Sequence, residues 1–416
     1  MPMPDAVRNT APASEADRHP APGAVDGDTR HADDRPASDY KIAVYLPDIR
    51  VGGAELSLIR LARGMARRGP QVVLVVHDTH PDTLHLAAGL EVVSLDVKRT
   101  FAAVRQLARF IAIEKPDVLL SGLPHNNLAA VAARKLARSK CRLVLTEHAP
   151  ISNQIRAEGG WRFRMLPTLI RRGYPLADAV VAVSRGVQLD LTAMIAPQFR
   201  ARLIFNPIIP EDVADLCAEP IDHPWLDRER YDTVLFVGRL SREKRVLTLV
   251  RAFNRARRRR PRLRLLIAGD GPDRERIVQM IERLDLDEKV RLVGNIENPF
   301  AWMHRCKVFV LPSLFEGFGN VLVEAMAAGT HVISTDCPVG PREILQGGKF
   351  GTLVPMGDIE AMRRAITHAV DRDALPEGAT EHAMGFTEDR AVSRYLALFE
   401  QLMFGRTLPP RAGGAA

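Results

Sequence analysis

Residues 308–334 read VFVLPSLFEGFGNVLVEAMAAGTHVIS. This stretch begins and ends with apolar runs (308–311 and 331–334), and between them a helical pattern follows a Gly-Phe-Gly turn. The order predicts a strand, a loop, a helix and a strand, which is the repeating unit of a parallel α/β sheet. It places Glu316 in the loop at the carboxyl end of the first strand and Glu324 in the helix, eight positions later.

The loop and the start of this helix have the composition of a ligand site. Ligands bind at the carboxyl edge of open α/β sheets. The helix N-terminus near Asn320 and Val321 offers unpaired N–H groups and a partial positive charge, which suit a phosphate. The turn at 317–319 contains Phe318 between two glycines, and Gly317 and Gly319 let the backbone approach a ligand closely. The two glutamates can accept hydrogen bonds from hydroxyl groups on either side of that phosphate. The stretch therefore predicts a site for a nucleotide sugar.

The spacing of the two glutamates resembles the Glu-x7-Glu motif of retaining glycosyltransferases of the GT-B fold, family 4. A lone Glu-x7-Glu is a weak signal, but four further motifs occur in the order of that family. They are VGGAE at 51–55, TEH at 146–148, FVGRL at 236–240 followed by Lys244, and AGDGP at 268–272. The stretch STDCPVGPREIL at 334–345 is similar to the subgroup that builds polysaccharides and lipid-linked oligosaccharides. The resemblance covers residues 40–400.

The resemblance implies that a set of residues holds the donor diphosphate. Arg239 and Lys244 match residues that clamp it, and they would neutralise the charge that builds on the leaving group as the glycosidic bond breaks. Gly52 and Gly53 would bring backbone N–H groups to the same diphosphate. The plain alternative is a basic helix start for the first pair and an ordinary turn for the second.

The resemblance also implies roles around the sugar. His148 matches a histidine near the reacting centre of the donor sugar, Glu316 a glutamate that binds sugar hydroxyls, and Glu324 a glutamate that holds the ribose. Neither glutamate is expected to act as a base or a nucleophile. In this family the departing phosphate itself is thought to help deprotonate the acceptor, so catalysis depends on positioning and electrostatics. No metal ion and no other cofactor are expected.

The length and the pattern of elements predict two domains. A chain of 416 residues exceeds the ~250–300 residues that one core usually serves. Strands are expected at 42–46, 72–76, 118–120, 143–146, 179–183, 233–237, 263–268, 290–293 and 308–311, alternating with helices such as 54–68, 101–114 and 390–403. Such alternation is typical of parallel sheets covered by helices. The expected fold is α/β of the GT-B type, with two Rossmann-like doubly wound parallel-sheet domains facing each other across a cleft.

We therefore expect six parts along the chain. They are a disordered tail (1–39), an acceptor domain (40–208), a proline-rich linker (209–231), a nucleotide-sugar domain (232–385), a helix that crosses back to the first domain (386–405) and a flexible tail (406–416).

Composition narrows the class of protein. Residues 1–39 carry few large apolar side chains, so they cannot offset the entropy of ordering. They contain eight acidic residues and four arginines, so the remaining chain holds a net charge of +12 while the whole holds +8. No signal-peptide pattern and no apolar run of 18 residues occurs, and the four cysteines form no metal pattern. We expect a cytoplasmic protein with reduced thiols, working at the inner face of the membrane.

Two motifs are typical of other protein classes, and the sequence around each of them argues against that class. Asp285-Leu286-Asp287 is an Asp-x-Asp, the metal-binding signature of the other major glycosyltransferase fold, but it lies where a helix ends and a strand begins, away from the cleft. Gly269-Asp270-Gly271 hints at a dinucleotide fold, but Arg274 stands where the third glycine would be.

Basic clusters bear on the acceptor. Residues 255–264 contain seven arginines, and residues 161–172 mix aromatic, apolar and basic side chains. The second pattern suits a helix at an anionic membrane surface. An ordinary helix that packs its apolar residues into the first domain fits equally well. Nucleic acid is not an expected partner, because no recognition motif accompanies the charge.

Taken with the resemblance, these patterns predict an enzyme. It would move a hexose or N-acetylhexosamine from a nucleotide diphosphate, with UDP as the expected nucleotide, to a saccharide or lipid-linked acceptor with retention of configuration. The first competitor is a nucleotide-sugar epimerase, which shares the two-domain cleft. The second is a non-catalytic homologue that binds a nucleotide sugar or a membrane.

Overall fold

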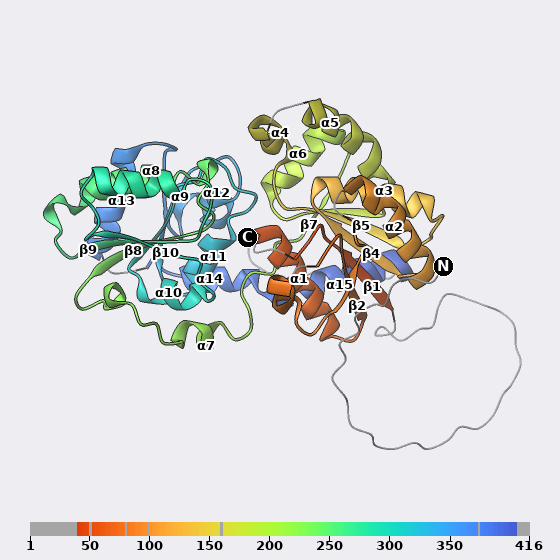
Figure 1. Cartoon of the computed structure of the whole chain (residues 1–416), viewed down its shortest axis with the longest axis horizontal. Helices are drawn as coiled ribbons and strands as arrows, with labels where there is room; N and C mark the ends of the chain where they lie inside the picture. Colours follow the sequence, from red (N-terminus) through yellow and green to blue (C-terminus); the bar gives the residue numbers. More distant parts are fainter. Residues whose placement is uncertain are drawn as a thin grey trace, which may run out of the picture. The chain divides into compact units, whose positions relative to one another are not determined.

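The computed structural model describes residues 40–49, 52–79, 81–97, 100–158, 161–372 and 375–405 (Figure 1). The tails expected at 1–39 and 406–416 lie outside this part. The described chain divides into two compact units. The first unit holds the residues up to Leu145, Gly173–Asp178 and those from Arg394 on, and the second holds Thr146–Arg172 and Ala179–Ser393. The domain boundaries expected from the sequence stay predictions.

The first sheet has seven strands in the order β3-β2-β1-β4-β5-β6-β7. Their bounds are β1 (Lys41–Tyr45), β2 (Gln71–Val76), β3 (Glu91–Ser94), β4 (Val118–Gly122), β5 (Arg142–Glu147), β6 (Ala179–Ala182) and β7 (Arg202–Leu203). The strand pair β1–β2, like β1–β4, is parallel. Strand β4 is buried along its whole length because helices cover both faces of a doubly wound sheet.

Helices follow most strands of this sheet. Their bounds are α1 (Gly53–Ala66), α2 (Thr100–Glu114), α3 (Pro124–Leu136), α4 (Ile151–Glu158), α5 (Trp161–Gly173), α6 (Arg185–Ile195) and α15 (Glu388–Phe404), with short 3-10 turns η1 (Pro81–Ala87) and η2 (Tyr174–Leu176). Helix α1 buries a stripe that includes Leu58, Ile59 and Met65, which recur at helical spacing. Helices α2 and α3 pack side by side.

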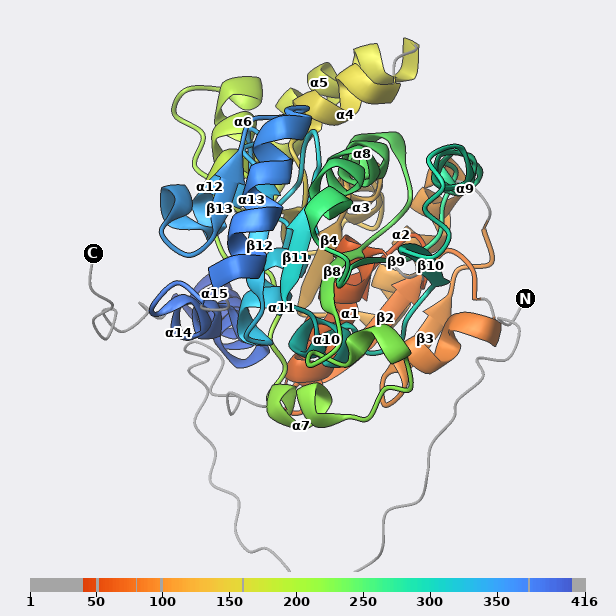
Figure 2. The same ribbon diagram turned by 90° about the vertical axis from the view of Figure 1, so that its left-hand side faces the viewer.

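The second sheet has six strands in the order β10-β9-β8-β11-β12-β13. Their bounds are β8 (Asp232–Val237), β9 (Leu263–Ala268), β10 (Val290–Gly294), β11 (Val308–Leu311), β12 (His331–Thr335) and β13 (Thr352–Val354). Figure 2 shows them in this order, from β13 at the left to β10 at the right. All the pairings are parallel, so the carboxyl ends of the strands meet at one edge.

Helices cover both faces of the second sheet. Helices α8 and α13 lie on one face, and α10 and α11 lie on the other (Figure 1). The helices are α7 (Val213–Ala218), α8 (Val246–Ala256), α9 (Arg274–Arg283), α10 (Pro299–Arg305), α11 (Asn320–Ala327), α12 (Pro341–Ile344), α13 (Ile359–Arg372) and α14 (Ala379–Ala383). Five 3-10 turns complete this part: η3 (Pro224–Leu226), η4 (Arg242–Lys244), η5 (Arg257–Arg259), η6 (Gln346–Gly348) and η7 (Met384–Phe386).

The stretch expected as a linker is more structured than its prolines indicate. Residues 209–231 contain α7 and η3, and they bury Cys217 and Trp225. Arg305 donates a hydrogen bond to the carbonyl of Cys217 over 3.0 Å, which fixes α7 against α10. The hydrophobic periodicity is weak here because each buried apolar residue makes its own separate contact. The elements are too short to form one continuous apolar face.

All four cysteines lie in the described part of the chain, and all are buried and unpaired with one another. Burial raises the pKa of each thiol above its ordinary value, and the nearby Glu316 carboxylate adds to the shift at Cys337, whose pKa is about 12. The thiols are therefore protonated and unreactive at neutral pH. Among the described residues, no helix combines the length and the apolar character needed to cross a bilayer.

Candidate active site

Glu316 lies in the loop after β11, as the sequence predicts, and two donors hold it. Lys244 Nζ donates to Glu316 Oε1 over 2.7 Å, and Ser313 Oγ donates to the same oxygen over 2.5 Å. Glu316 is only 8% exposed. A buried carboxylate needs such partners, because burial without them penalises the charged form. The geometry therefore fixes the orientation of this group.

The loop after β8 brings Lys244 to that position. Lys244 ends the single turn η4, and Arg245 follows in a left-handed conformation with a φ of 52° before α8 begins. The amide of Leu314 donates to the carbonyl of Glu243 over 2.8 Å, which ties the loop after β11 to this turn. Arg239 lies earlier in the same loop, and its exposed side chain forms no ion pair with the described residues. A cation without a partner at a strand end can receive an anion.

Glycines let the loops after β8 and β9 pack backbone against backbone. A Cβ on Gly269 would lie 2.1 Å from the carbonyl oxygen of Gly238, and one on Gly271 would lie 2.5 Å from that of Leu240. The amide of Leu240 also donates to the carbonyl of Asp270 over 2.9 Å. Only glycine allows this approach. The AGDGP stretch therefore supports the loop that carries Arg239 and Lys244.

Helix α11 begins without a side-chain cap. Its N-cap residue is Gly319, at a φ of 102°, which has no side chain to accept a hydrogen bond from the first turn. The N–H groups of this turn are the ones that a helix leaves without intrahelical partners. Asn320 and Val321 are half-buried at this end, and Asn206 donates a hydrogen bond to the Asn320 amide oxygen over 3.0 Å. The arrangement suits a phosphate oxygen.

Phe318 and Glu324 flank this helix start. The ring of Phe318 is 2% exposed, with its centroid 5.4 Å from that of Phe205 and 5.5 Å from that of Phe386. Its side chain therefore anchors the loop, and only its backbone is left to meet a ligand. Glu324 lies in the second turn of α11 and is 8% exposed.

His148 follows β5, and the second unit brings it to the Glu316 loop. A Cβ on Gly317 would lie 1.8 Å from the carbonyl oxygen of His148, so the two backbones are in direct contact. Both ring nitrogens of His148 are buried and have no hydrogen-bond partner among the described residues. Burial lowers its pKa to about 4, and the nearby Asn206 side chain opposes this shift weakly. A neutral imidazole with unsatisfied nitrogens is ready to bind a polar ligand.

Gly52 and Gly53 belong to the first unit, after β1. Gly52 is the N-cap of α1 with an extended φ of −125°, and no atom lies within 4 Å of a Cβ built on Gly53. The Glu55 carboxylate lies against Gly52, 2.3 Å from such a Cβ, and a negative charge at a helix N-terminus is favourable. The other predicted site residues lie in the second unit.

Sequence reasoning missed two residues of the site. Ser313, which donates to Glu316, was seen only as part of a loop, although a Ser-x-x-Glu spacing was visible. Asn206 lies near the end of the acceptor domain expected at 40–208 and belongs to none of the quoted motifs. The Asn206 side chain donates to Asn320 and also lies near His148. These residues are too far apart in the sequence for a spacing pattern to predict their contact.

The Asp-x-Asp motif lies where it was expected, between a helix and the strand that follows it. Asp285 and Asp287 lie in the turn between α9 and β10, at the amino end of the strand. Within the described residues, no group of three or more His, Cys, Asp and Glu side chains is arranged to hold a metal ion.

Comparison with known families gives two matches on this chain. Residues 231–372 match the family described as glycosyl transferases group 1, and residues 51–212 match the family described as glycosyltransferase family 4. The two matches fall on the second sheet and on the first sheet, respectively.

Curated relatives include two transferases of Campylobacter jejuni. One is N-acetylgalactosamine-N,N'-diacetylbacillosaminyl-diphospho-undecaprenol 4-alpha-N-acetylgalactosaminyltransferase, 30% identical over 283 residues, which are 67% of this chain and 73% of the relative. The other is GalNAc-alpha-(1->4)-GalNAc-alpha-(1->3)-diNAcBac-PP-undecaprenol alpha-1,4-N-acetyl-D-galactosaminyltransferase, 24% identical over 378 residues, which are 87% of this chain and 99% of the relative.

Solved structures share the fold. Anabaena HepE, in complex with UDP and glucose, superposes with a TM-score of 0.70 at 20% identity, over 86% of this chain and 98% of that chain. Sucrose-phosphate synthase from Thermosynechococcus elongatus gives a TM-score of 0.71 at 21% identity, over 88% of this chain and 100% of that chain.

Proposed function

This chain belongs to the family 4 glycosyltransferases with the GT-B fold, and from that premise we propose that it transfers a hexose or N-acetylhexosamine from a UDP-sugar, with retention of configuration. The observation that carries this proposal is the Lys244–Glu316 pair beside the uncapped start of α11. It joins a fixed cation, a buried carboxylate and the positive end of a helix, which together match a diphosphate bonded to a sugar.

In the proposed mechanism, the positive groups act on the leaving diphosphate. Lys244 Nζ has three donors, so it can keep its bond to Glu316 and still reach a phosphate oxygen. Arg239, together with the amides at the start of α11, would add further donors. For the first unit, we propose the amides of Gly52 and Gly53 as phosphate donors. These groups stabilise the charge that develops as the glycosidic bond breaks.

The sugar and the ribose would be held from two sides. Glu316 accepts hydrogen bonds from hydroxyls of the donor sugar, and Glu324 accepts them from the ribose. His148 is neutral, and its unsatisfied nitrogens would meet the sugar near the reacting carbon. The departing phosphate then takes the proton of the acceptor hydroxyl on the same face of the sugar, so none of these side chains acts as a nucleophile.

We propose that this transfer needs no metal ion and no other cofactor, because Arg239 and Lys244 supply the positive charge that a metal would supply elsewhere. Turnover in excess EDTA should equal turnover without it. A loss of activity that Mg2+ or Mn2+ restores would contradict this proposal.

We propose a lipid-linked or saccharide acceptor at an anionic membrane. The names of both Campylobacter relatives contain a diphospho-undecaprenol or PP-undecaprenol acceptor. Helix α5 supports the same reading, because Met165 and Leu169 are 50% and 49% exposed one turn apart. Arg164 and Arg172 are exposed on the same helix, as expected for a surface that meets lipid headgroups.

A panel of nucleotide sugars tests the proposed function. The purified chain is incubated with UDP- and GDP-sugars, with and without a prenyl-diphosphate disaccharide, and free nucleoside diphosphate is measured. Acceptor-dependent release of UDP, and a product whose NMR coupling constant shows the anomer of the donor, is the expected result. A sugar epimer without an acceptor would favour the epimerase, and binding without release would favour a non-catalytic homologue.

A further inference from the structure

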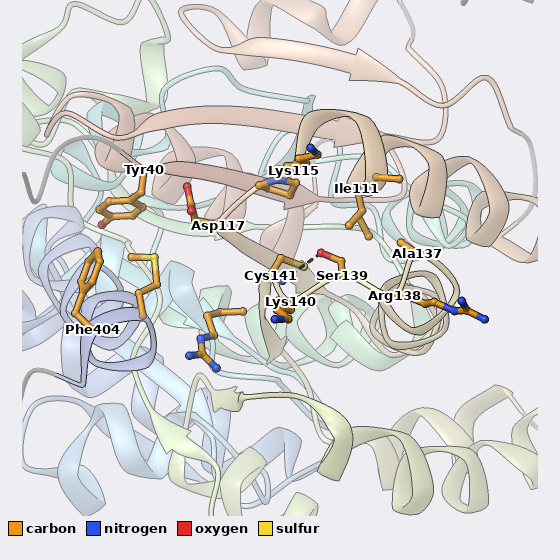
Figure 3. Close-up of a pocket in the computed structure, with 14 residues that line it drawn as sticks. Tyr40, Ile111, Lys115, Asp117, Ala137, Arg138, Ser139, Lys140, Cys141 and Phe404 are labelled. Atoms are coloured by element: carbon orange, nitrogen blue, oxygen red, sulfur yellow. Dashed lines mark hydrogen bonds between the residues drawn. The ribbon is translucent and has the colours of Figure 1, made fainter. Parts of the chain in front are cut away.

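A cavity of about 500 Å3 lies in the first unit, away from the residues described above (Figure 3). Its walls come from the segments that precede β1, β4 and β5 and from the end of α15. It therefore opens at the amino ends of these strands, whereas Gly52 and Gly53 follow the carboxyl end of β1. Its volume is within the range of sites for small organic molecules.

The two ends of the cavity differ in character. Figure 3 shows Tyr40 and Phe404 one above the other at one end, and Arg138 at the opposite end. Lys115 and Lys140 line the walls between the two ends. One end is thus aromatic, and the other lining residues include the cations Lys115, Arg138, Lys140 and Arg142 beside small and apolar residues. Aromatic and cationic groups together are the pattern of a site for an amphiphilic anion.

The cations of this cavity outnumber its acids. Asp117 is the one acidic residue among the lining side chains, and its Oδ2 accepts the amide of Lys41 over 2.9 Å. No carboxylate pairs with Lys115, Arg138 or Lys140 within the described residues. Like charges gathered on one concave surface raise the local concentration of anions.

Helix ends explain only part of this charge. Lys115 comes directly after α2 and Arg138 two residues after the end of α3, both in left-handed conformations with φ of 43° and 49°. Basic residues are favourable there because of the helix dipoles. Lys140 has no such reason, since it lies in the link that enters β5.

Tyr40 supplies an independent sign of a ligand. Its side chain is 5% exposed, and its hydroxyl forms no hydrogen bond with the described residues. Buried hydroxyls nearly always have a partner. Burial first, and then the nearby Glu400, raise the pKa of Tyr40 to about 12, so the phenol keeps its proton and can donate it to an acceptor oxygen.

We propose that this cavity binds a small organic phosphate with an aromatic body. The body lies between Tyr40 and Phe404, the phosphate lies against Lys115, Arg138 and Lys140, and the Tyr40 hydroxyl donates to an oxygen of the ligand. This site is independent of sugar transfer, because none of its residues takes part in the donor site.

Calorimetry with three probes tests the proposal on the full chain. Phenyl phosphate joins both halves of the expected ligand, while inorganic phosphate and phenol each offer one. Phenyl phosphate should bind at least about tenfold more tightly than either part. Equal affinities for phenyl phosphate and inorganic phosphate would show an adventitious anion site and overturn the proposal.

Variants locate the binding. Arg138→Gln/Lys140→Gln should weaken phenyl phosphate binding at least about tenfold, since charge-assisted hydrogen bonds are lost, and should leave phenol binding in place. The matched control is Arg109→Gln/Lys135→Gln, which removes two exposed charges from α2 and α3 outside the cavity. Binding at the donor site would persist in every variant. Equal losses in the two double variants would overturn the proposal.

The variant Tyr40→Phe provides a second test of the binding site if the double variant fails to fold. The change removes one oxygen and preserves the ring, so folding should be unaffected. Phenyl phosphate should bind several-fold more weakly to it, with phenol weakened as well, because both use the same donor. Unchanged affinity for both probes would show that the hydroxyl does not face a ligand and would overturn the proposed site.

Discussion

Glu316 is a carboxylate whose position is settled before any substrate arrives. Lys244 and Ser313 donate to the same oxygen, and the side chain is nearly buried. Groups fixed in this way lose little energy to reorganisation when charge develops during a reaction, which is the advantage of a preorganised site. The same contacts make the effect of single substitutions predictable.

Lys244→Ala should lower kcat/KM by about 100-fold or more, a typical loss for one electrostatic donor to a transition state. It removes the cation proposed for the diphosphate and also one of the two donors of Glu316. Steady-state kinetics measure the loss, and Lys349→Ala, at an exposed lysine of the same unit, serves as the control. Near-normal turnover in a folded Lys244→Ala protein would remove this lysine from the site.

The two glutamates should separate by their effect on free UDP. Glu324→Gln should weaken UDP binding by about tenfold, because the ribose contact exists without the sugar. Glu316→Gln should leave UDP affinity nearly unchanged and reduce transfer. Calorimetry with UDP measures both affinities. Equal losses would show that the division of roles between these carboxylates is wrong.

Among the elements, the long apolar strands and the amphipathic helices were predictable from sequence. The unit β11–α11–β12 was predicted from its two apolar runs and its Gly-Phe-Gly turn and is confirmed. Strands β3, β7 and β13 were not predicted, because each has two to four residues and gains its place from a neighbouring strand rather than from its own pattern. The GT-B fold and the glycosyltransferase family were predicted from ordered motifs and are confirmed.

The site was predictable as a set of positions and not as a set of contacts. Strand ends placed Lys244 and Glu316 at one edge of the sheet. Their direct ion pair joins residues 72 positions apart. The turn η4, which positions Lys244 for this pair, is only three residues long, so it shows no hydrophobic periodicity from which it could be predicted. Asn206 was missed for the same reason, since its contact with Asn320 depends on tertiary packing.

Helix α5 combines both readings of residues 161–172. Leu166 and Ile170 are buried, as an ordinary packed helix requires, while Met165 and Leu169 are half-exposed beside arginines. The side chains of 161–163, on which the sequence interpretation also relied, lie outside the described residues. The described part of α5 thus presents apolar and basic groups to solvent together, and the membrane proposal rests on that part.

Substitution of this face should abolish vesicle binding. The variant Met165→Ser/Leu169→Ser with Arg164→Ser/Arg172→Ser should sediment with anionic vesicles much less than wild type at low salt. Each basic residue contributes only ~1 kcal/mol near the surface, and salt screens it. Wild-type binding should therefore fall at high salt.

A control that also changes two apolar and two basic residues separates this face from general surface charge. Leu136→Ser/Leu189→Ser with Lys135→Ser/Arg109→Ser changes two exposed leucines and two exposed basic residues on α2, α3 and α6. It should bind vesicles as wild type does. If both variants lose binding equally, or if wild type ignores anionic vesicles, α5 is a packed helix and a soluble acceptor is favoured.

At the scale of the whole molecule, four histidines of the described part make the free energy of unfolding depend on pH in the same direction. Burial lowers the pKa of His77, His148, His223 and His382 below the ordinary value of 6.5. Their neutral forms are favoured by folding, so the unfolded chain binds more protons as pH falls below 6.5. The free energy of unfolding should therefore decrease as the pH is lowered from 7.0 to 5.5.

His148 should account for on the order of 1 kcal/mol of this fall, given its pKa of about 4 in the folded chain. Urea denaturation at the two pH values measures the difference, and His148→Asn should reduce it. His368→Asn, at an exposed position on α13, is the control. A difference that is unchanged in His148→Asn would mean that folding does not lower the pKa of this ring.

Because its cysteines are buried, the natural chain should not be labelled by thiol-specific dyes. Maleimides attack exposed thiolates, and none of the four sulfurs offers one at neutral pH. A single cysteine placed on the surface, for example by Met165→Cys on α5, would then carry the only fluorophore. Fluorescence from that one site reports the polarity around α5 without any need to remove a native cysteine.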